Sequence, residues 1–166
     1  MTQKESARHI ERRLFDAVTI TLCAGRERAL ASGGKTVARL RPDIGTDVVE
    51  IARLERAVGR WGERFLARIF TDTEIAYCRA KREPLRHFAG RLAAKEAVYK
   101  ALGLHWSGPF SWRMIEISTA ASGAPEVLLH NVAGEGTEEK NIAVSISHEG
   151  EVAVAVAAAF RGRRSQ

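Results

Sequence analysis

Residues 85–103 read LRHFAGRLAAKEAVYKALG, and this stretch decides the fold. It is rich in alanine, leucine, lysine and glutamate, which are among the residues that form helices most readily. Gly103 stands where a helix commonly stops, because glycine adopts the left-handed backbone of a C-terminal cap at no steric cost. We therefore predict the strongest helix of the chain from Leu85 to Leu102.

The chain before this helix predicts one strand followed by shorter helices. Residues 44–50 are β-branched and apolar enough for a buried strand that leads into a helical region. Two glycines, Gly59 and Gly62, are expected to interrupt that region. Residues 71–74 have the spacing of a capping box, so a further helix should begin near Asp72.

The chain after the long helix predicts two pairs of strands. Residues 114–118 and 126–130 have the composition of strands joined by a turn. Residues 141–147 and 152–159 resemble a closing hairpin, with residues 148–151 as the connection. This order of elements predicts an α+β fold in which a long helix packs on an antiparallel sheet.

Length and charge predict a single domain with a basic extension. A chain of 166 residues with 45% hydrophobic residues buries one core. Residues 1–41 carry 9 basic and 4 acidic residues, which leaves 17 basic and 16 acidic residues for the other 125. We therefore expect an N-terminal extension over residues 1–41, a domain over 42–160 and a basic tail over 161–166. Within the domain, basic residues would act as local patches.

Cysteine usage predicts a cytoplasmic protein. Cys23 and Cys78 are too few and too far apart for a disulfide framework, which fits a reducing compartment. A paired arginine at positions 12–13 precedes an apolar run, but polar residues interrupt that run, and this argues against an export signal. No segment approaches the roughly 18 apolar residues that span a bilayer, so we expect no membrane association.

Three charged residues are placed where chemistry could occur. Asp47 lies near the end of the predicted strand and Glu96 lies in the middle of the alanine-rich helix. Two buried carboxylates need a partner, and hard oxygen ligands are what Mg²⁺ takes. Lys100 follows Glu96 by one helical turn. Spacing alone equally allows an ordinary surface ion pair between Glu96 and Lys100, with Asp47 capping the next helix.

Three segments resemble the signatures of holo-acyl-carrier-protein synthases, which are phosphopantetheinyl transferases. The segments occur in the family's order and at about its spacing, and three matches in order are far more specific than one. With two weaker matches between them, the resemblance extends from about residue 43 to residue 160 and leaves residues 1–41 uncovered. The three segments are IGTDVVEI (44–51), FAGRLAAKEAVYKALG (88–103) and SISH (145–148).

The resemblance implies a reaction and its catalytic residues. The phosphopantetheine arm of coenzyme A would pass to a serine of an acyl carrier protein, in a magnesium-dependent reaction. Asp47 and Glu96 would hold Mg²⁺ against the pyrophosphate of coenzyme A, and Lys100 would stabilise the transition state by its charge. Glu96, directly or through a water molecule, is our candidate for the base that takes the serine proton.

The resemblance also implies a coenzyme A site. Gly103, Ser147 and His148 would line it together with Lys100. On its own terms, a lone histidine near a hairpin is more often structural than functional. The loop over residues 104–110 would pass near the nucleotide, although it departs from the family's glycine-rich pattern.

A stripe of arginines predicts the docking surface for the carrier protein. A solvated helix face is the ordinary interpretation of such a stripe. The resemblance instead implies that this helix receives the acidic carrier, in contacts that weaken with salt. The residues assigned to docking are Arg53, Arg60, Arg64, Phe65 and Arg68, and Arg56 belongs to the same stripe.

Two other classes of protein were considered. Residues 29–36 satisfy the loose form of a phosphate-binding loop, but Pro42 ends the segment too early for the helix that such a loop requires. A basic nucleic-acid-binding module is the main alternative, yet aromatic residues are only 7% of the chain and no recognised motif supports it. We therefore expect no nucleic-acid partner.

The length of the chain predicts an oligomer. Relatives that fuse two copies of this unit are about twice as long, so a single copy would find its second half in another subunit. The resemblance implies a homotrimer with active sites between subunits, and it points to the enzyme of fatty acid biosynthesis.

Overall fold

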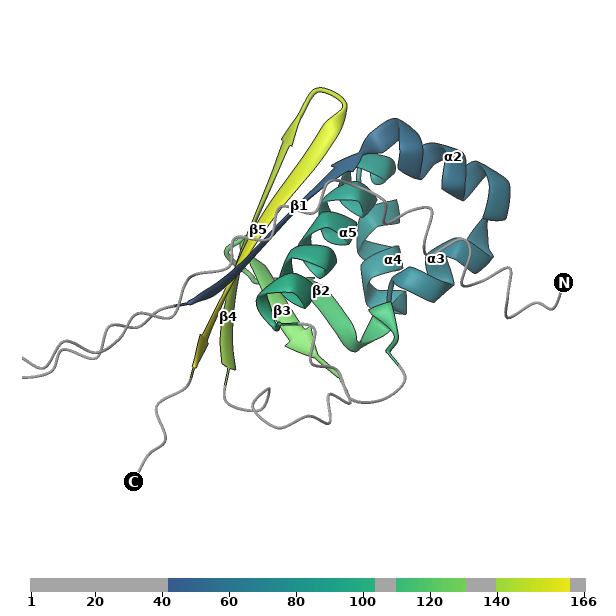
Figure 1. The fold of residues 1–166 in the computed structure, drawn as a ribbon. Coiled ribbons are helices and arrows are strands. Elements are labelled where there is room, and N and C mark those ends of the chain that lie inside the picture. Colours follow the sequence, from purple (N-terminus) through teal and green to yellow (C-terminus); the bar gives the residue numbers. More distant parts are fainter. Residues whose placement is uncertain (1–41, 104–109, 131–139, 162–166) are drawn as a thin grey trace, which may run out of the picture.

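The computed structural model describes residues 42–103, 110–130 and 140–161 (Figure 1). The helices are α2 (Ile51–Trp61), α3 (Glu63–Ile69), α4 (Asp72–Arg79), α5 (Pro84–Ala101) and the short 3-10 helix η1 (Trp112–Met114). The strands are β1 (Asp43–Glu50), β2 (Ile115–Thr119), β3 (Pro125–Leu129), β4 (Lys140–Glu149) and β5 (Val152–Arg161).

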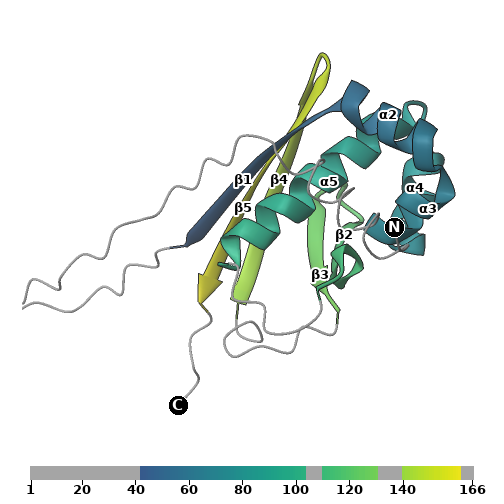
Figure 2. The ribbon, with the colours of Figure 1, turned by 45° about the vertical axis from the view of Figure 1, so that its right-hand side comes forward.

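Helix α5 forms the centre of the molecule. Strands β1, β5 and β4 form an antiparallel sheet in that order, and β2 pairs with β3 in a second, two-stranded sheet. Figures 1 and 2 show α5 between the three-stranded sheet and the group α2, α3 and α4. The helix contacts all three strands of the larger sheet. The predicted α+β fold, with a long helix on an antiparallel sheet, is confirmed.

Small residues allow α5 to lie close to the sheet. On β5, every second residue from Ala153 to Ala159 is an alanine that is at most 1% exposed. On β1, a Cβ added to Gly45 would lie 2.0 Å from the carbonyl oxygen of Ala97. Since no side chain fits in that space, glycine sets how closely β1 approaches α5. This approach brings Asp47, two residues later on β1, against α5.

Most of the predicted boundaries are correct, and two need revision. The capping box is present: Glu74 N donates to Thr71 Oγ1 over 3.3 Å, and Thr71 N donates to Glu74 Oε2 over 2.8 Å. Gly62 separates α2 from α3 as expected, whereas Gly59 lies inside α2. The assignment of residues 148–151 to the hairpin connection was wrong. β4 continues through residue 149, and the turn consists of residues 150 and 151 alone.

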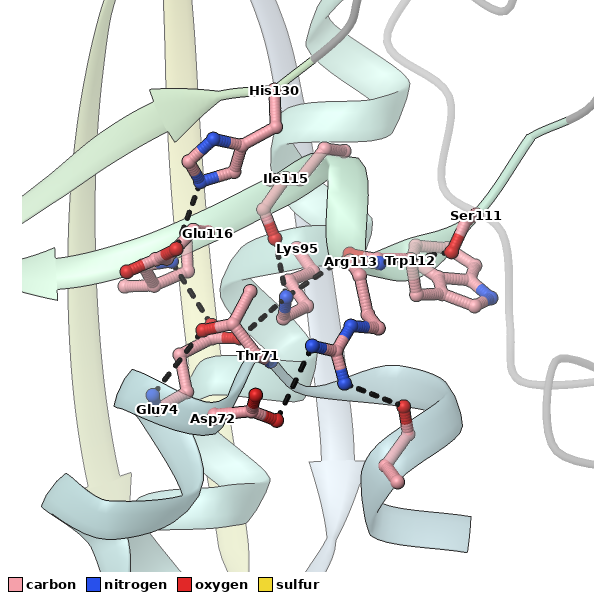
Figure 3. Close-up of polar contacts among 12 residues, drawn as sticks. Thr71, Asp72, Glu74, Lys95, Ser111, Trp112, Arg113, Ile115, Glu116 and His130 are labelled. Atoms are coloured by element: carbon pink, nitrogen blue, oxygen red, sulfur yellow. Dashed lines mark hydrogen bonds and ion pairs between the residues drawn. The ribbon is translucent and has the colours of Figure 1, made fainter. Parts of the chain in front are cut away.

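A buried ion pair joins α5 to α4, on the side of α5 that faces away from the three-stranded sheet (Figure 3). Lys95 is fully buried, and its Nζ lies 2.8 Å from Glu74 Oε2 on α4. The same Nζ donates to the carbonyl oxygens of Trp112 and Ile115, while Glu74 Oε1 accepts from Ile117 N over 2.9 Å. Burial lowers the pKa of Lys95, and the charge of Glu74 opposes that effect. The pair therefore fixes α4, α5 and β2 to one another.

Candidate active site

Two carboxylates and a lysine meet where β1 crosses α5. Asp47 is 5% exposed and Glu96 is 9% exposed. Lys100 Nζ lies 2.8 Å from Asp47 Oδ1 and donates to the carbonyl oxygen of Thr46 over 3.0 Å. Asp47 and Lys100 are 53 residues apart in sequence, so it is the packing of β1 on α5 that creates the site. Lys100 pairs with Asp47, and this differs from the ordinary pairing within the helix that spacing alone allowed.

The ionisation of Glu96 reflects these surroundings. Burial raises the pKa of Glu96 to about 8, and the charge of Asp47 together with a hydrogen bond to it acts in the same direction. The charges of Lys100 and Arg53 oppose the shift. The surroundings of Glu96 therefore supply too little positive charge to offset the cost of ionising its buried carboxyl group. An added cation would relieve this, since a nearby positive charge favours the ionised form.

The side chains of this site suit Mg²⁺ better than a metal ion whose ligands all come from the protein. Among the described residues, no group of three or more His, Cys, Asp or Glu side chains gathers to hold a metal. Two carboxylates, Asp47 and Glu96, do meet. Mg²⁺ is commonly held by one or two carboxylates, with waters and substrate phosphates completing its octahedron. The donor set therefore matches a magnesium ion that is shared with a phosphate-bearing substrate.

A second polar site lies near the start of α5. His148 Nε2 on β4 is 2.8 Å from the carbonyl oxygen of Arg86. Beside it is a cavity of about 170 Å³, which is lined in part by His87, Arg91 and Tyr77. Arg91 is 5% exposed, its guanidinium lies 3.8 Å from the centre of the Tyr77 ring, and its buried Nε has no hydrogen-bond partner. Arg91 Nη2 donates to Thr119 Oγ1 over 2.9 Å, so Nε is the buried donor of this guanidinium that stays without a partner among the described residues. A buried, positively charged donor beside a cavity favours an anionic ligand.

Positive charge also acts on the other titratable groups of this cavity. Burial lowers the pKa of His87, and the charges of Arg91 and His148 act in the same direction. The pKa of Tyr77 is lowered, first by a hydrogen bond with Thr119 and further by Arg91 and Lys81, although burial opposes the shift. Each of these shifts disfavours additional positive charge or favours negative charge. The cavity is therefore electrostatically suited to an anion.

The structure does not bring the predicted coenzyme residues into one place. His148 contacts α5 near Gly90, whereas Glu96 is six residues further along, or about 9 Å of helix axis. Lys100 and Gly103 lie further still, at the C-terminal end. Ser147 and His148 are neighbours on a strand, so their side chains project from opposite faces of the sheet. His148 faces α5 and Ser147 is exposed on the other face.

The arginine stripe is divided between two helices. Arg60 on α2 and Arg64 and Arg68 on α3 are exposed, as is Arg56, while Arg53 is half-buried and close enough to Glu96 to lower its pKa. The proposed role of Phe65 as an exposed apolar contact is wrong for this chain. Phe65 is only 4% exposed and belongs to the hydrophobic core. The residues 104–109 predicted to pass near the nucleotide lie outside the described residues.

Sequence reasoning left three residues of these sites without a role. Gly45, Gly90 and Arg91 all lie within the segments that carried the resemblance. Their sequence positions alone do not show that one glycine faces a carbonyl, that another faces a histidine ring, or that the guanidinium is buried. An arginine within an otherwise apolar stretch of the helix was the one signal available, because an arginine that such a stretch buries needs partners.

The fold thus places two buried carboxylates and a lysine towards the C-terminal end of α5, and a cavity with a buried arginine near its N-terminal end. The sequence profile of the 4'-phosphopantetheinyl transferase superfamily matches residues 43–157, and the chain belongs to this family. The resemblance to phosphopantetheinyl transferases of the holo-acyl-carrier-protein synthase type, which the sequence segments predicted, is confirmed.

Individual relatives agree with this assignment. The holo-[acyl-carrier-protein] synthase of Moorella thermoacetica is 48% identical over 118 residues, which cover 69% of this chain and 91% of that protein. The corresponding synthase of Chlamydia pneumoniae is 44% identical over 117 residues, covering 70% and 95%. The crystal structure of the Helicobacter pylori synthase in complex with coenzyme A has a TM-score of 0.62 at 34% identity, covering 70% and 98%.

Proposed function

We propose that this enzyme transfers the 4'-phosphopantetheine group of coenzyme A to a serine of an apo-acyl carrier protein, with Mg²⁺ as cofactor. The main support is the buried pair of Asp47 and Glu96 beside Lys100, at the end of α5. Relatives of this chain are named holo-[acyl-carrier-protein] synthases, after the holo form of this carrier. As the sequence resemblance implies, we further propose that the carrier is that of fatty acid biosynthesis and that the enzyme is cytoplasmic.

The reaction exchanges the phosphoanhydride bond of coenzyme A for a phosphate ester bond to serine. The serine oxygen bonds to the β-phosphorus of coenzyme A, and the bond from that phosphorus to the bridging oxygen breaks. Adenosine 3',5'-bisphosphate leaves with the electron pair. Glu96, directly or through a water molecule, accepts the serine proton. Lys100 stabilises the negative charge on the departing phosphate.

Asp47 and Glu96 would hold the Mg²⁺ ion, which when bound supplies charge neutralisation on the phosphates and orients them. Lys100 Nζ donates to Asp47 Oδ1. Its positive charge therefore lies beside the carboxylates, where it would also contact the phosphates that share the site.

The cavity at His148 and Arg91 would bind an anionic part of coenzyme A. Its support is the unsatisfied, buried Arg91 Nε and the cationic surroundings of Tyr77 and His87. Because this cavity is at the opposite end of α5 from Lys100 and Gly103, we propose that one coenzyme molecule uses the two sites from different subunits. Gly103 would contribute at the C-terminal end of α5, and Ser147 would contribute from the outer face of the sheet.

The outer face of the three-stranded sheet supports a homo-oligomer, which we propose is a trimer. Ile44, Val48 and Val156 are 53%, 49% and 45% exposed on the face opposite to α5. Val48 pairs with Val154 across the strands, and Thr46 pairs with Val156. An apolar patch of this kind on a sheet commonly marks an interface. If neighbouring subunits cover this patch, the carboxylate site of one subunit would lie beside the His148 cavity of another.

Exposed arginines on α2 and α3 would receive the acidic carrier protein. Arg60, Arg64 and Arg68 are exposed, and Arg53 lies between this surface and Glu96. Charges at such a surface act mainly on the association rate and the orientation of the partner. Charge reversal at Arg64 or Arg68 should raise KM for the carrier and weaken its salt dependence, with kcat retained.

Intact-mass spectrometry of the carrier tests the reaction directly. An apo-acyl carrier protein is incubated with coenzyme A, Mg²⁺ and enzyme, and a mass gain of one phosphopantetheine arm is expected. The double variant Asp47→Ala, Glu96→Ala should give no gain, whereas the exposed-carboxylate control Glu126→Gln should behave as wild type. A gain with the double variant refutes the site. No gain from wild type with several carriers refutes the function and favours the nucleic-acid-binding alternative.

A further inference from the structure

The hydrogen bond of His148 determines which of its ring nitrogens carries a proton. His148 Nε2 lies 2.8 Å from the carbonyl oxygen of Arg86, in the first turn of α5. A carbonyl oxygen only accepts hydrogen bonds, so Nε2 must be the donor. In the neutral imidazole the other nitrogen, Nδ1, is then the acceptor. The contact thus assigns a single neutral tautomer.

Gly90 makes room for the ring. A Cβ on residue 90 would lie 2.6 Å from His148 Nε2, 3.1 Å from His148 Cε1 and 2.9 Å from Ile146 Cγ2. These distances are shorter than van der Waals contact, so any side chain at this position would displace the imidazole. Ile146 and His148 lie on the same face of β4. The ring therefore sits against the helix only because residue 90 has no side chain.

No local backbone requirement explains this glycine. Gly90 lies in the middle of an 18-residue helix and is not among the glycines of positive φ in the described chain. A glycine inside a helix is less stable than alanine by about 1 kcal/mol. Gly90 is also buried and lines the cavity, in contrast to the exposed Gly59 of α2, where an added Cβ would meet nothing within 4 Å. Close contacts with His148 and Ile146 of β4 distinguish Gly90 from Gly59, and the shortest of them is with the His148 ring.

The groups around His148 show what the exposed nitrogen would meet. The His87 ring lies edge-on at 6.1 Å between centroids, and Arg91 shares the same cavity. The cavity therefore carries several donors and positive charge beside the histidine. A ligand that enters it next to the ring reaches Nδ1, because Nε2 is committed to the carbonyl oxygen of Arg86.

We propose that Gly90 is a positioning residue for His148. It seats the imidazole against the first turns of α5, fixes the tautomer with the proton on Nε2, and leaves Nδ1 as an acceptor for a hydroxyl or N–H donor of coenzyme A. The position and the tautomer of the ring do not depend on the reaction. The role of Nδ1 rests on the proposed function, in which Arg91 of the same cavity binds an anionic part of coenzyme A.

The tautomer is tested by nitrogen-15 NMR of the histidine side chains in the full-length protein. The His148 signal is assigned by its absence in His148→Ala. Wild type and the control Gly59→Ala should both show the proton on Nε2, whereas Gly90→Ala should lose this preference. A wild-type pattern in Gly90→Ala would overturn the positioning role, as would a proton on Nδ1 in the neutral wild-type ring.

The link to the coenzyme is tested by calorimetric titration of coenzyme A. Gly90→Ala should bind about ten-fold more weakly than wild type, the loss expected when one hydrogen bond to the ligand is removed. Gly59→Ala should bind as wild type. If Gly90 acts through His148, then Gly90→Ala should cost little further affinity in a His148→Ala background. Additive losses in that double variant would overturn the proposal.

The two measurements separate this inference from the proposed function. An altered tautomer in Gly90→Ala with unchanged coenzyme affinity would refute the coenzyme role of Nδ1 and leave the seating of the ring intact. If Gly90→Ala does not fold, recovery of folding in the double variant with His148→Ala supplies the test, because removal of the ring relieves the shortest contact of the added methyl group. Where both fold, Gly90→Ala should cost less stability in the His148→Ala background than in wild type. Equal losses, or a double variant that fails to fold although His148→Ala folds, would contradict the proposed contact.

Discussion

Glu96 is the residue whose ionisation the fold changes most clearly among the groups near the carboxylate site. Burial, and then the charge of Asp47, raise its pKa from 4.5 to about 8. The folded protein therefore retains a proton that the unfolded chain releases over this interval. The stability contributed by that proton is fully present below about pH 4.5 and is lost as the pH rises through about 8.

This sign gives a test in the absence of metal. With a chelator present, the Tm of wild type should fall as the pH rises from about 5 to about 8.5. Glu96→Gln, which has no carboxyl group to titrate, should show a smaller fall over the same interval. Scanning calorimetry at several pH values measures both slopes, and the other titrating groups are common to the two proteins. Parallel curves would show that Glu96 does not titrate in this way.

At the scale of elements, the contact of β1 with α5 depends on Gly45. A Cβ at this position would lie 2.0 Å from Ala97 O and 2.7 Å from Ala101 N, and both are backbone atoms that cannot move aside alone. We expect Gly45→Ala to destabilise the protein by about 3 kcal/mol, at the upper end for overpacked cores. It should also weaken metal binding, because β1 carries Asp47.

Urea unfolding monitored by circular dichroism measures the change at Gly45. Gly59→Ala is the matched control, because its exposed helical position has open space for a methyl group. It should stabilise the protein by up to about 1 kcal/mol. Equal effects of the two substitutions would mean that β1 and α5 are not as close as described.

The ion pair of Lys95 and Glu74 joins α5 to α4 and leads to a second prediction at this scale. Lys95→Met leaves a buried carboxylate without its cation, and we expect a loss of about 3–5 kcal/mol. Lys95→Met combined with Glu74→Gln should recover part of this loss, because the uncompensated charge is gone. Urea unfolding of the single and double variants forms a double-mutant cycle. A double variant less stable than either single variant would contradict this account.

At the scale of the whole molecule, the separation of the two sites along α5 predicts active sites shared between subunits. Lys100→Ala and His148→Ala would each inactivate one half of the site. When the two variants are mixed, dissociated and reassembled, part of the activity should return, since mixed oligomers contain pairs of unmodified halves. Reassembly of each variant alone is the control. No recovery from mixtures that are shown to exchange subunits would favour a site within one chain.

Much of the fold could be predicted from local sequence. The long helix, the capping box at Thr71 and the strands of the closing hairpin depend on propensities and periodicities within a few residues. The extension over residues 1–41 remains a prediction, since these residues lie outside the described part of the chain. In that described part, no helix is long and apolar enough to cross a membrane. The cytoplasmic location also stays a prediction.

The sequence by itself determined the family, because the matching segments have a specific order and spacing, and it predicted Asp47, Glu96 and Lys100 as site residues. Only the tertiary structure decided that Lys100 pairs with Asp47, that Phe65 is buried, and that Gly90 faces His148. Each of these depends on elements far apart in the chain that pack together. Helix and strand signals extend over a few residues, whereas contacts between elements depend on how whole surfaces fit.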